Sequence, residues 1–313
     1  MAIDRFELAR ELAELRRIAL ERSEGDPLPR GRACEERLLA EVAELDLHEN
    51  ITQLEVDGYT VLPPGKAAPL NLVERIQGAV QRVEEKRQGE RFGVGSGLGS
   101  ALFHLIPEDP AFEEALMAPA PLTLITYLLG YRAKLGQSTG LIKTSSAPAL
   151  PLHADHSAAR MFPAPWPRAS NQANITWVLT DYTRDNGAVC VWPGSHRWGK
   201  PVPPELTMAH DREEIRVLEV PVGSLIVWHG SLWHGAVPRT AEGRRLTLVL
   251  AFVRHTIQAQ EAYWASTTPE MLARNPSRFG TLMGLSSPMP WFQDGPLVET
   301  LAEFQEQTGS QFE

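Results

Sequence analysis

The residues best suited to chemistry in this sequence form an H-x-D triplet, His153-Ala154-Asp155, directly after the short apolar run Leu150-Pro151-Leu152. If the backbone is extended at the histidine and turns at the alanine, an imidazole nitrogen and a carboxylate oxygen can face one cavity. A second imidazole from a distant strand would complete a 2-His-1-carboxylate face on a metal ion, which leaves three positions open and is typical of non-haem Fe(II) oxygenases. Taken alone the triplet is a weak signal, because 9 His and 39 acidic residues produce such triplets by chance.

The second imidazole has two candidates, His229 and His234, in the segment 224–236. Residues 221–228 have the pattern of a turn and a buried strand that would deliver His229 at its end, whereas His234 opens the next strand. Spacing alone does not separate the two histidines. A basic residue follows them at a spacing that reaches the same cavity across a strand pair, so an organic anion could be anchored beside the metal.

The composition indicates an ordinary globular protein. The chain has 313 residues, of which 43% are hydrophobic and 22% charged. Cys34 and Cys190 form no C-x-x-C motif, so we expect neither a disulfide framework nor a zinc knuckle, and a reducing compartment is the default. The opening residues lack the apolar stretch of a signal peptide, and no apolar run is long enough to cross a membrane. The net charge of −9 disfavours nucleic acid as a partner. We therefore expect a cytoplasmic protein with no membrane or nucleic-acid partner.

Helical periodicity dominates the first part of the chain. The Gly-rich passage 93–99 lacks the G-K-[ST] ending of a phosphate-binding loop, so it is interpreted as a flexible loop. One short strand is expected at 58–62, where Pro63 and Pro64 end it. The expected helices cover residues 4–22, 34–46, 48–57, 70–86 and 109–130.

From residue 132 the pattern changes to short β-prone runs separated by turn signals, which favours an all-β sandwich or barrel. We therefore expect a single domain in three parts: a mostly helical part (1–130), a β core (131–256) and a C-terminal cap (257–313). The Pro-rich interruption 156–172 is expected to be a lid over the site, because long loops inside compact domains are often functional. The expected strands are 132–145, 150–154, 173–181, 188–192, 215–220, 224–229, 234–237 and 245–256.

Several strings in this β region resemble the phytanoyl-CoA dioxygenase family. The most specific is N-G-x-x-x-x-x-P-G-S-H-R, which begins at Asn186 and ends at Arg197. The others are H-A-D at 153–155, W-V-L-T-D at 177–181, W-H-G-S-L-W-H-G at 228–235 and R-R-L-T-L at 244–248. The resemblance covers roughly residues 130–256, with weaker support from 54–62.

The resemblance implies an α+β fold with a mainly β core, namely a double-stranded β-helix (a cupin-like jelly roll) on which N-terminal helices pack. It also implies an Fe(II)/2-oxoglutarate-dependent dioxygenase that uses O2 and releases succinate and CO2. In the family the histidine of the second H-G is the ligand, which selects His234 to join His153 and Asp155. Arg245 stands at the offset of the family's 2-oxoglutarate arginine. Because Asp155 is a carboxylate ligand, hydroxylation of a small organic substrate is favoured over halogenation.

Other contacts to the co-substrate are less defined by the resemblance. Ala236 and Arg239 occupy the neighbourhood where the family often has serine and asparagine, so Thr247 and Gln137 are the candidates that replace those hydrogen bonds. Trp177 is a further candidate, with a core position in the barrel as its structural alternative.

The loop 156–172 offers candidates for substrate contact by position alone: His156, Arg160, Phe162 and Trp166. His196, in the P-G-S-H corner, is expected to be structural rather than a metal ligand.

Two other classes of function fit the same barrel. One is a cupin-like isomerase or hydrolase that uses another divalent metal, since ligand affinity alone does not select iron. The other is a non-catalytic jelly-roll binding protein. A guanidinium at Arg245 favours the oxygenase over the first, and the intact ligand set favours it over the second. The identity of the substrate and the oligomeric state are not readable from the sequence.

Overall fold

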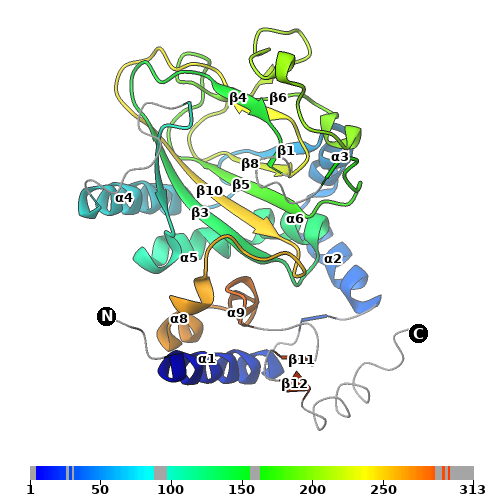
Figure 1. The fold of residues 1–313 in the computed structure, drawn as a ribbon, viewed down its shortest axis with the longest axis vertical. Coiled ribbons are helices and arrows are strands. Elements are labelled where there is room, and N and C mark those ends of the chain that lie inside the picture. Colours follow the sequence, from blue (N-terminus) through cyan, green and yellow to red (C-terminus); the bar gives the residue numbers. More distant parts are fainter. Residues whose placement is uncertain are drawn as a thin grey trace.

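The computed structural model describes residues 5–25, 28–29, 32–87, 97–155, 163–285, 291–292 and 295–296. Its centre is a pair of antiparallel sheets that face each other, with helices packed on the outer side of the larger sheet (Figure 1). This is the α+β jelly roll that the resemblance implies. Among the helices described, none combines the length and apolar content needed to cross a membrane.

The larger sheet has six strands in the order β1-β8-β5-β10-β3-β2. Two of them, β1 and β2, come from the part of the chain before residue 131 and form the two edges. The strands are β1 (Tyr59–Leu62), β2 (Ser100–Phe103), β3 (Lys134–Lys143), β5 (Gln172–Val178), β8 (Leu225–His229) and β10 (Arg245–Val253).

The smaller sheet has four strands in the order β4-β9-β6-β7. Figure 1 shows β4 and β6 facing β8 and β5. Its strands are β4 (Leu150–His153), β6 (Val189–Val191), β7 (Arg216–Val217) and β9 (His234–Ala236). A separate two-stranded ribbon joins β11 (Trp291–Phe292) to β12 (Gly295–Pro296).

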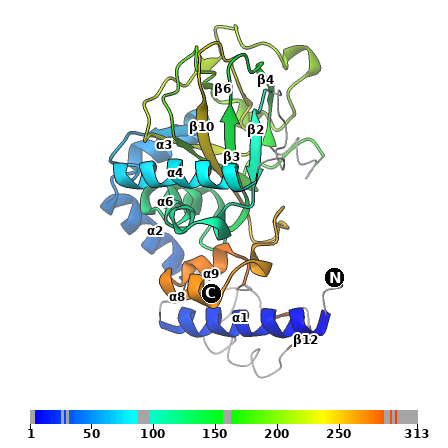
Figure 2. The same cartoon turned by 90° about the vertical axis from the view of Figure 1, so that its left-hand side faces the viewer.

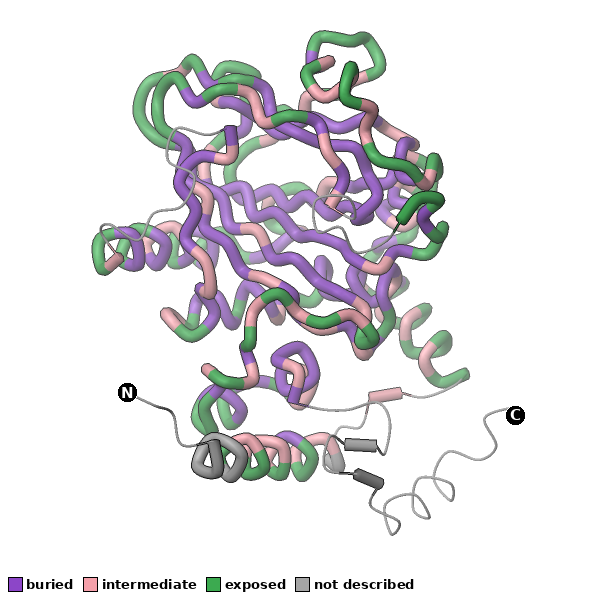
Figure 3. Tube along the Cα trace, viewed as in Figure 1, coloured by how far each residue is buried: buried purple, intermediate pink, exposed green. Residues whose placement is uncertain are grey.

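Helices cover the outer face of the larger sheet, as the two views show (Figures 1 and 2). Their apolar side chains and those of the sheet form one large core cluster, and the buried strands stand out against the half-exposed helices in Figure 3. These helices are α2 (Arg32–Glu44), α3 (His48–Asp57), α4 (Leu70–Lys86), α5 (Pro110–Leu116) and α6 (Pro119–Leu129). A second group, α1 (Arg5–Gly25), α8 (Pro269–Arg274) and α9 (Arg278–Leu282), packs together below them.

The sequence of β5, Gln-Ala-Asn-Ile-Thr-Trp-Val, explains how one sheet serves both a core and a cavity. Successive side chains of a strand point to opposite faces. Ala173, Ile175 and Trp177 therefore enter the helix-side core cluster. The polar residues Gln172, Asn174 and Thr176 face the space between the sheets instead.

The structure differs from the sequence-based expectations in two places. The single helix expected at 109–130 is two helices, because the helical conformation is interrupted at Met117–Ala118. Helix α6 then begins with Pro119 in its first turn, where the missing N–H of proline costs no hydrogen bond. Strand β2 was not expected, since it is short and follows the Gly-rich passage. Most of that passage lies outside the described residues.

Candidate active site

Three ligand-type side chains converge between the sheets. His153 ends β4, His234 opens β9, and the two are directly opposite each other in the antiparallel pairing. Their rings lie 4.3 Å apart, centroid to centroid. Asp155 follows two residues after His153, and its Oδ1 lies 3.8 Å from His234 Nε2. One ligand atom from each of the three lies within 4.8 Å of the others, which is the arrangement of a facial metal site.

Both imidazoles are oriented for metal binding by backbone carbonyls. His153 Nδ1 donates to the Pro151 carbonyl at 2.9 Å, and His234 Nδ1 donates to the Leu232 carbonyl at 3.0 Å. Because a carbonyl only accepts, each Nδ1 carries the proton and each Nε2 presents a lone pair. Burial also lowers the pKa of His234 to about 4, so that this ring is neutral at physiological pH. The donor set therefore fits a divalent metal ion.

The carboxylate of Asp155 is held from the floor of the cavity. Its Oδ2 accepts from Asn174 Nδ2 at 2.7 Å and from Trp228 Nε1 at 3.2 Å. Asn174 and Trp228 are opposite each other on β5 and β8, so that both donors approach from the larger sheet. With Oδ2 occupied in this way, Oδ1 is turned toward His234 and is available as a ligand.

His229, the other candidate from the sequence, does not join this group. Its Nε2 faces the Arg168 carbonyl at 3.2 Å, and its Nδ1 accepts from the Ser231 amide at 3.0 Å. The ring of His196 lies beside that of His229, tilted at 5.3 Å between centroids, and His196 is not part of the metal-type cluster. The P-G-S-H corner supports the site indirectly, because Ser195 Oγ accepts from the Trp233 amide one residue before His234.

The triad opens into a cavity of about 350 Å³ between the two sheets. Its floor is the inner face of the larger sheet, where residues paired across β3, β10 and β5 form rows. The row that holds Asn174, the partner of Asp155, is called the metal row and contains Gln137, Ala251 and Asn174. The next row contains Thr139, Val249 and Thr176. Leu141 pairs with Thr247 in the third row, and Lys143 pairs with Arg245 in the last. The cavity therefore has a metal end and a cationic end.

At the cationic end, the side chains of Arg245 and Lys143 are both buried. Arg245 donates from Nη1 to the Gly187 carbonyl, and its guanidinium carbon lies 4.7 Å from the centroid of the Tyr182 ring. Among the described residues, Arg245 Nε and Lys143 Nζ have no hydrogen-bond partner. Unpartnered buried N–H groups of this kind are costly, so the cationic end fits an anion. It also fits the distal carboxylate of a 2-oxo acid whose other end chelates the metal.

The other residues predicted from the sequence to contact the co-substrate, namely Thr247, Gln137 and Trp177, lie in three different parts of the structure. Thr247 lines the cavity and its hydroxyl is 2.7 Å from the hydroxyl of Tyr182. Gln137 also lines the cavity, but in the metal row, three rows away from the row that holds Lys143 and Arg245. Trp177 is a correction: it is fully buried in the helix-side core, so the structure contradicts its prediction as a co-substrate contact.

Of the loop candidates, the structure describes only Trp166, and its position differs from the expectation. Trp166 is buried in a cluster behind the smaller sheet, and its amide donates to the Gly199 carbonyl, so it does not line the cavity. That contradicts a lid role for this tryptophan. His156, Arg160 and Phe162 lie outside the described residues.

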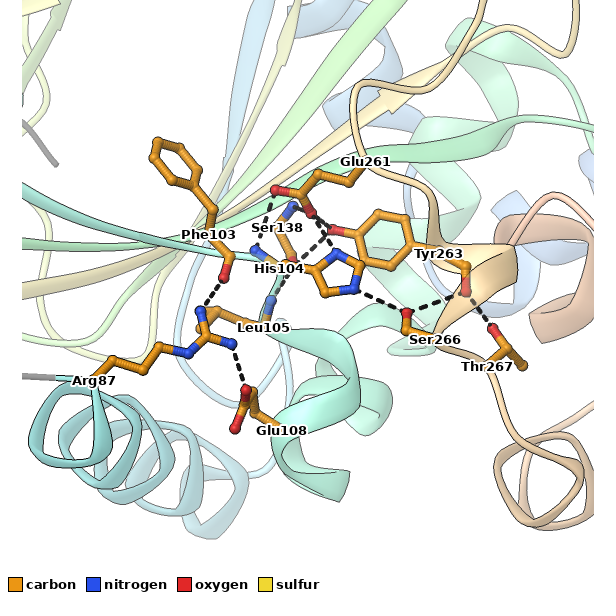
Figure 4. Close-up of polar contacts among 10 residues, drawn as sticks. All are labelled: Arg87, Phe103, His104, Leu105, Glu108, Ser138, Glu261, Tyr263, Ser266 and Thr267. Atoms are coloured by element: carbon orange, nitrogen blue, oxygen red, sulfur yellow. Dashed lines mark hydrogen bonds and ion pairs between the residues drawn. The ribbon is translucent and has the colours of Figure 1, made fainter. Parts of the chain in front are cut away.

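The wall beyond the metal row is fixed by a partly buried polar network that the sequence did not reveal (Figure 4). Glu261 accepts from the backbone amides of His104 at 3.1 Å and Ser138 at 3.3 Å, and from the Tyr263 hydroxyl. His104, Ser138 and Glu261 each directly follow a residue that lines the cavity. These lining residues are Phe103, Gln137 and Gln260, in the same order. The network therefore ties three separate segments of the wall together.

Asn174, Trp228 and Lys143 line the cavity but were not among the candidates from the sequence. The alternation of polar and apolar residues in β5 could have identified Asn174 as facing the cavity. Lys143 had no such signal, since its position opposite Arg245 depends on the pairing of two strands that are distant in the sequence.

Comparisons with known proteins agree with this geometry. Dioxygenase af480 of Aspergillus fumigatus is 27% identical over 176 residues, which cover 55% of this chain and 53% of that protein. The chain thus matches about half the length of the fungal dioxygenase. The uncharacterized protein Rv1501 of Mycobacterium tuberculosis is 29% identical over 224 residues, which cover 70% of this chain and 77% of its own length.

Solved structures share the fold. HygX from Streptomyces hygroscopicus, with nickel and 2-oxoglutarate bound, aligns with a TM-score of 0.56 and 17% identity over 68% of this chain and 89% of HygX. The non-heme alpha ketoglutarate dependent epimerase SnoN from nogalamycin biosynthesis aligns with a TM-score of 0.54 and 19% identity over 68% and 84% of the two chains. The family model for phytanoyl-CoA dioxygenase (PhyH) matches residues 54–246. Since that match spans more than half of the sequence, the chain belongs to the phytanoyl-CoA dioxygenase family.

Proposed function

We propose that the protein is a non-haem Fe(II)/2-oxoglutarate-dependent dioxygenase that hydroxylates a small organic substrate. The observation that carries this proposal is the layout of one cavity. A two-histidine, one-carboxylate cluster stands at one end, and a buried arginine with a free N–H stands at the other. Family membership supports the same activity, and several structural neighbours bind a metal together with 2-oxoglutarate.

In this proposal His153, Asp155 and His234 hold the iron, and Arg245 holds the distal carboxylate of 2-oxoglutarate through charge-assisted hydrogen bonds. When bound, iron and 2-oxoglutarate supply the oxidising power, with O2 consumed and succinate and CO2 released. Thr247 and Tyr182 form a hydroxyl pair on the path between the two ends. Gln137, in the metal row, is placed to contact the co-substrate or the substrate rather than the cationic end.

The rest of the chain supplies orientation and exclusion of water. Carbonyls fix the two imidazoles, and Asn174 with Trp228 fixes Asp155. Apolar side chains such as Phe103, Leu141 and Val249 line much of the cavity wall. A pocket of this size and lining suits a small, largely apolar molecule.

The assignment of hydroxylation rests on Asp155. A carboxylate in that place fills the coordination position that a halide would need, so a halide-free oxidation is favoured. The structural neighbours include an epimerase and a carbocyclase, which shows that the fold hosts several outcomes. Product analysis is therefore needed once a substrate is known.

The test is an anaerobic titration of the protein with Fe(II) and 2-oxoglutarate, followed through the visible charge-transfer band of a 2-oxo acid that chelates iron. We expect the band with wild-type protein and its loss in His153→Ala, Asp155→Ala and His234→Ala. His229→Ala is the matched control, because this histidine contacts backbone groups of Arg168 and Ser231 outside the metal-type cluster and should leave the band unchanged. A wild-type protein that binds the metal but gives no band would overturn the proposal in favour of an enzyme using another metal, and one that binds no metal would favour a binding protein.

A further inference from the structure

Lys143 is a buried cation whose position has no structural explanation. It lies at the end of β3, directly opposite Arg245 on β10, and only 1% of its surface is exposed. Its Nζ has no hydrogen-bond partner among the described residues, although the side chain lines the cavity. A lysine that served only to stabilise the fold would be paired, because an unpaired buried charge costs free energy.

The immediate surroundings make this cost larger. Arg245 brings a second positive charge to the same end of the cavity, and Arg239 adds a third nearby. Arg239 is occupied, since it donates to Asn186 Oδ1 at 2.9 Å and to two backbone carbonyls. Arg245 and Lys143 therefore remain as the pair with unpartnered N–H groups that face the cavity.

We propose that Lys143 and Arg245 form a two-cation anchor for the distal carboxylate of 2-oxoglutarate. The inference rests on the proposed function and extends it to a residue that no sequence motif identified. A carboxylate has two oxygens, so it can accept from the guanidinium and the ammonium group together. The register of the sheet brings the two cations to the same row, at the far end of the cavity from the metal ligands.

The anchor has a consequence for pH. Burial, followed by the charge of Arg245, lowers the pKa of Lys143 to about 7 in the ligand-free protein. Of the other groups near it, Arg239 is hydrogen-bonded to Asn186 and to two backbone carbonyls, and burial raises the pKa of the Cys190 thiol to about 12, which keeps it neutral. The Tyr182 hydroxyl faces Thr247. Binding of a carboxylate should therefore be coupled to protonation of Lys143, and the affinity should fall about tenfold per pH unit above 7.

The experiment compares two 2-oxo acids on the anaerobic Fe(II) protein. 2-Oxoglutarate carries the distal carboxylate, whereas 2-oxopentanoate has the same chelating end without it. In Lys143→Met we expect the Kd of 2-oxoglutarate to rise by about tenfold or more, with little change for 2-oxopentanoate. Lys134→Met is the matched control, because it makes the same substitution on β3 outside the cavity and should leave both affinities unchanged.

Two further readouts separate an anchor from a structural role. The metal-free Lys143→Met protein should melt at a higher temperature than wild type, since an unpaired buried cation has been removed. In wild type the Kd of 2-oxoglutarate should rise with pH above 7, and this dependence should be lost in the variant and with 2-oxopentanoate.

The inference is overturned if Lys143→Met binds 2-oxoglutarate as tightly as wild type, if both acids lose affinity equally, or if the variant melts at a lower temperature. These results would leave the proposed function intact provided that wild type binds 2-oxoglutarate. If wild type binds neither acid, the proposed function and the anchor both fail.

Discussion

The hydrogen bond from Asn174 to Asp155 should control how tightly the site binds a metal ion. Replacing Asn174 by leucine keeps a similar side-chain volume but removes the donor that lies 2.7 Å from Asp155 Oδ2. Partners of this kind, which orient a metal ligand, typically change metal affinity by about 10–100-fold when they are lost. We therefore expect a rise in Kd of that size, or about 1.4–2.7 kcal/mol of binding free energy.

The substitution should not disturb the fold. Asn174 Oδ1 is buried and has no partner among the described residues, so the leucine also removes an unsatisfied acceptor. Trp228→Phe deletes the longer bond to the same oxygen, at 3.2 Å, and should cost less than about tenfold in affinity. Thr176→Val is the matched control: it lies two residues from Asn174 on the same face of β5, and its hydroxyl makes no hydrogen bond with the described residues.

The assay is a titration with Mn(II), a redox-stable substitute for Fe(II), in which the free ion is measured by electron paramagnetic resonance. Circular dichroism would verify that each variant is folded. The reasoning is refuted if folded Asn174→Leu binds Mn(II) like wild type, or if Thr176→Val weakens binding as much as Asn174→Leu does. A larger loss in Trp228→Phe than in Asn174→Leu would also contradict it, because the shorter bond would then be the less important one.

Two other predictions follow from buried side chains. Trp177→Phe should lower the free energy of unfolding by about 1–3 kcal/mol, measured by urea denaturation, because the indole packs in the helix-side core. The affinity for 2-oxoglutarate should stay unchanged. Weaker co-substrate binding in a folded variant would show instead that Trp177 contacts the co-substrate, as one interpretation of the sequence predicted. For Lys143, the pKa of about 7 in the folded protein lies below the 10.5 of the unfolded chain, so the unfolded state binds more protons between these values and stability increases with pH. The stability deficit of ligand-free wild type relative to Lys143→Met should thus shrink by about 1.4 kcal/mol per pH unit above 7, and a pH-independent difference would contradict this.

Much of the fold was predictable because its strands carry strong local patterns. The ranges expected for the β core match β3 to β10 within a few residues, since turn residues interrupt the apolar runs at nearly every strand end. Strand β2 was missed because four residues after a Gly-rich passage give too short a pattern. Its place in the sheet depends on pairing with β3, which no local signal encodes.

The convergence of His153, Asp155 and His234 was predictable, but the side chains that support them were not. His153 and Asp155 lie two residues apart in one short motif, and the family resemblance selected His234 over His229. Trp177 was a candidate for co-substrate contact with a core position as its alternative, and the polar–apolar alternation of its strand places it on the core side.

The edge position of β1 has a consequence for synthesis of the chain. Tyr59 pairs with Trp228, so β1 finds its partner only after most of the β core has been made. During translation this strand must wait with unpaired backbone groups, and the N-terminal helices must wait with uncovered apolar faces, which is a known route to aggregation. Because such non-local pairing also slows folding, truncations that end before β8 should accumulate as insoluble chains rather than as smaller folded units.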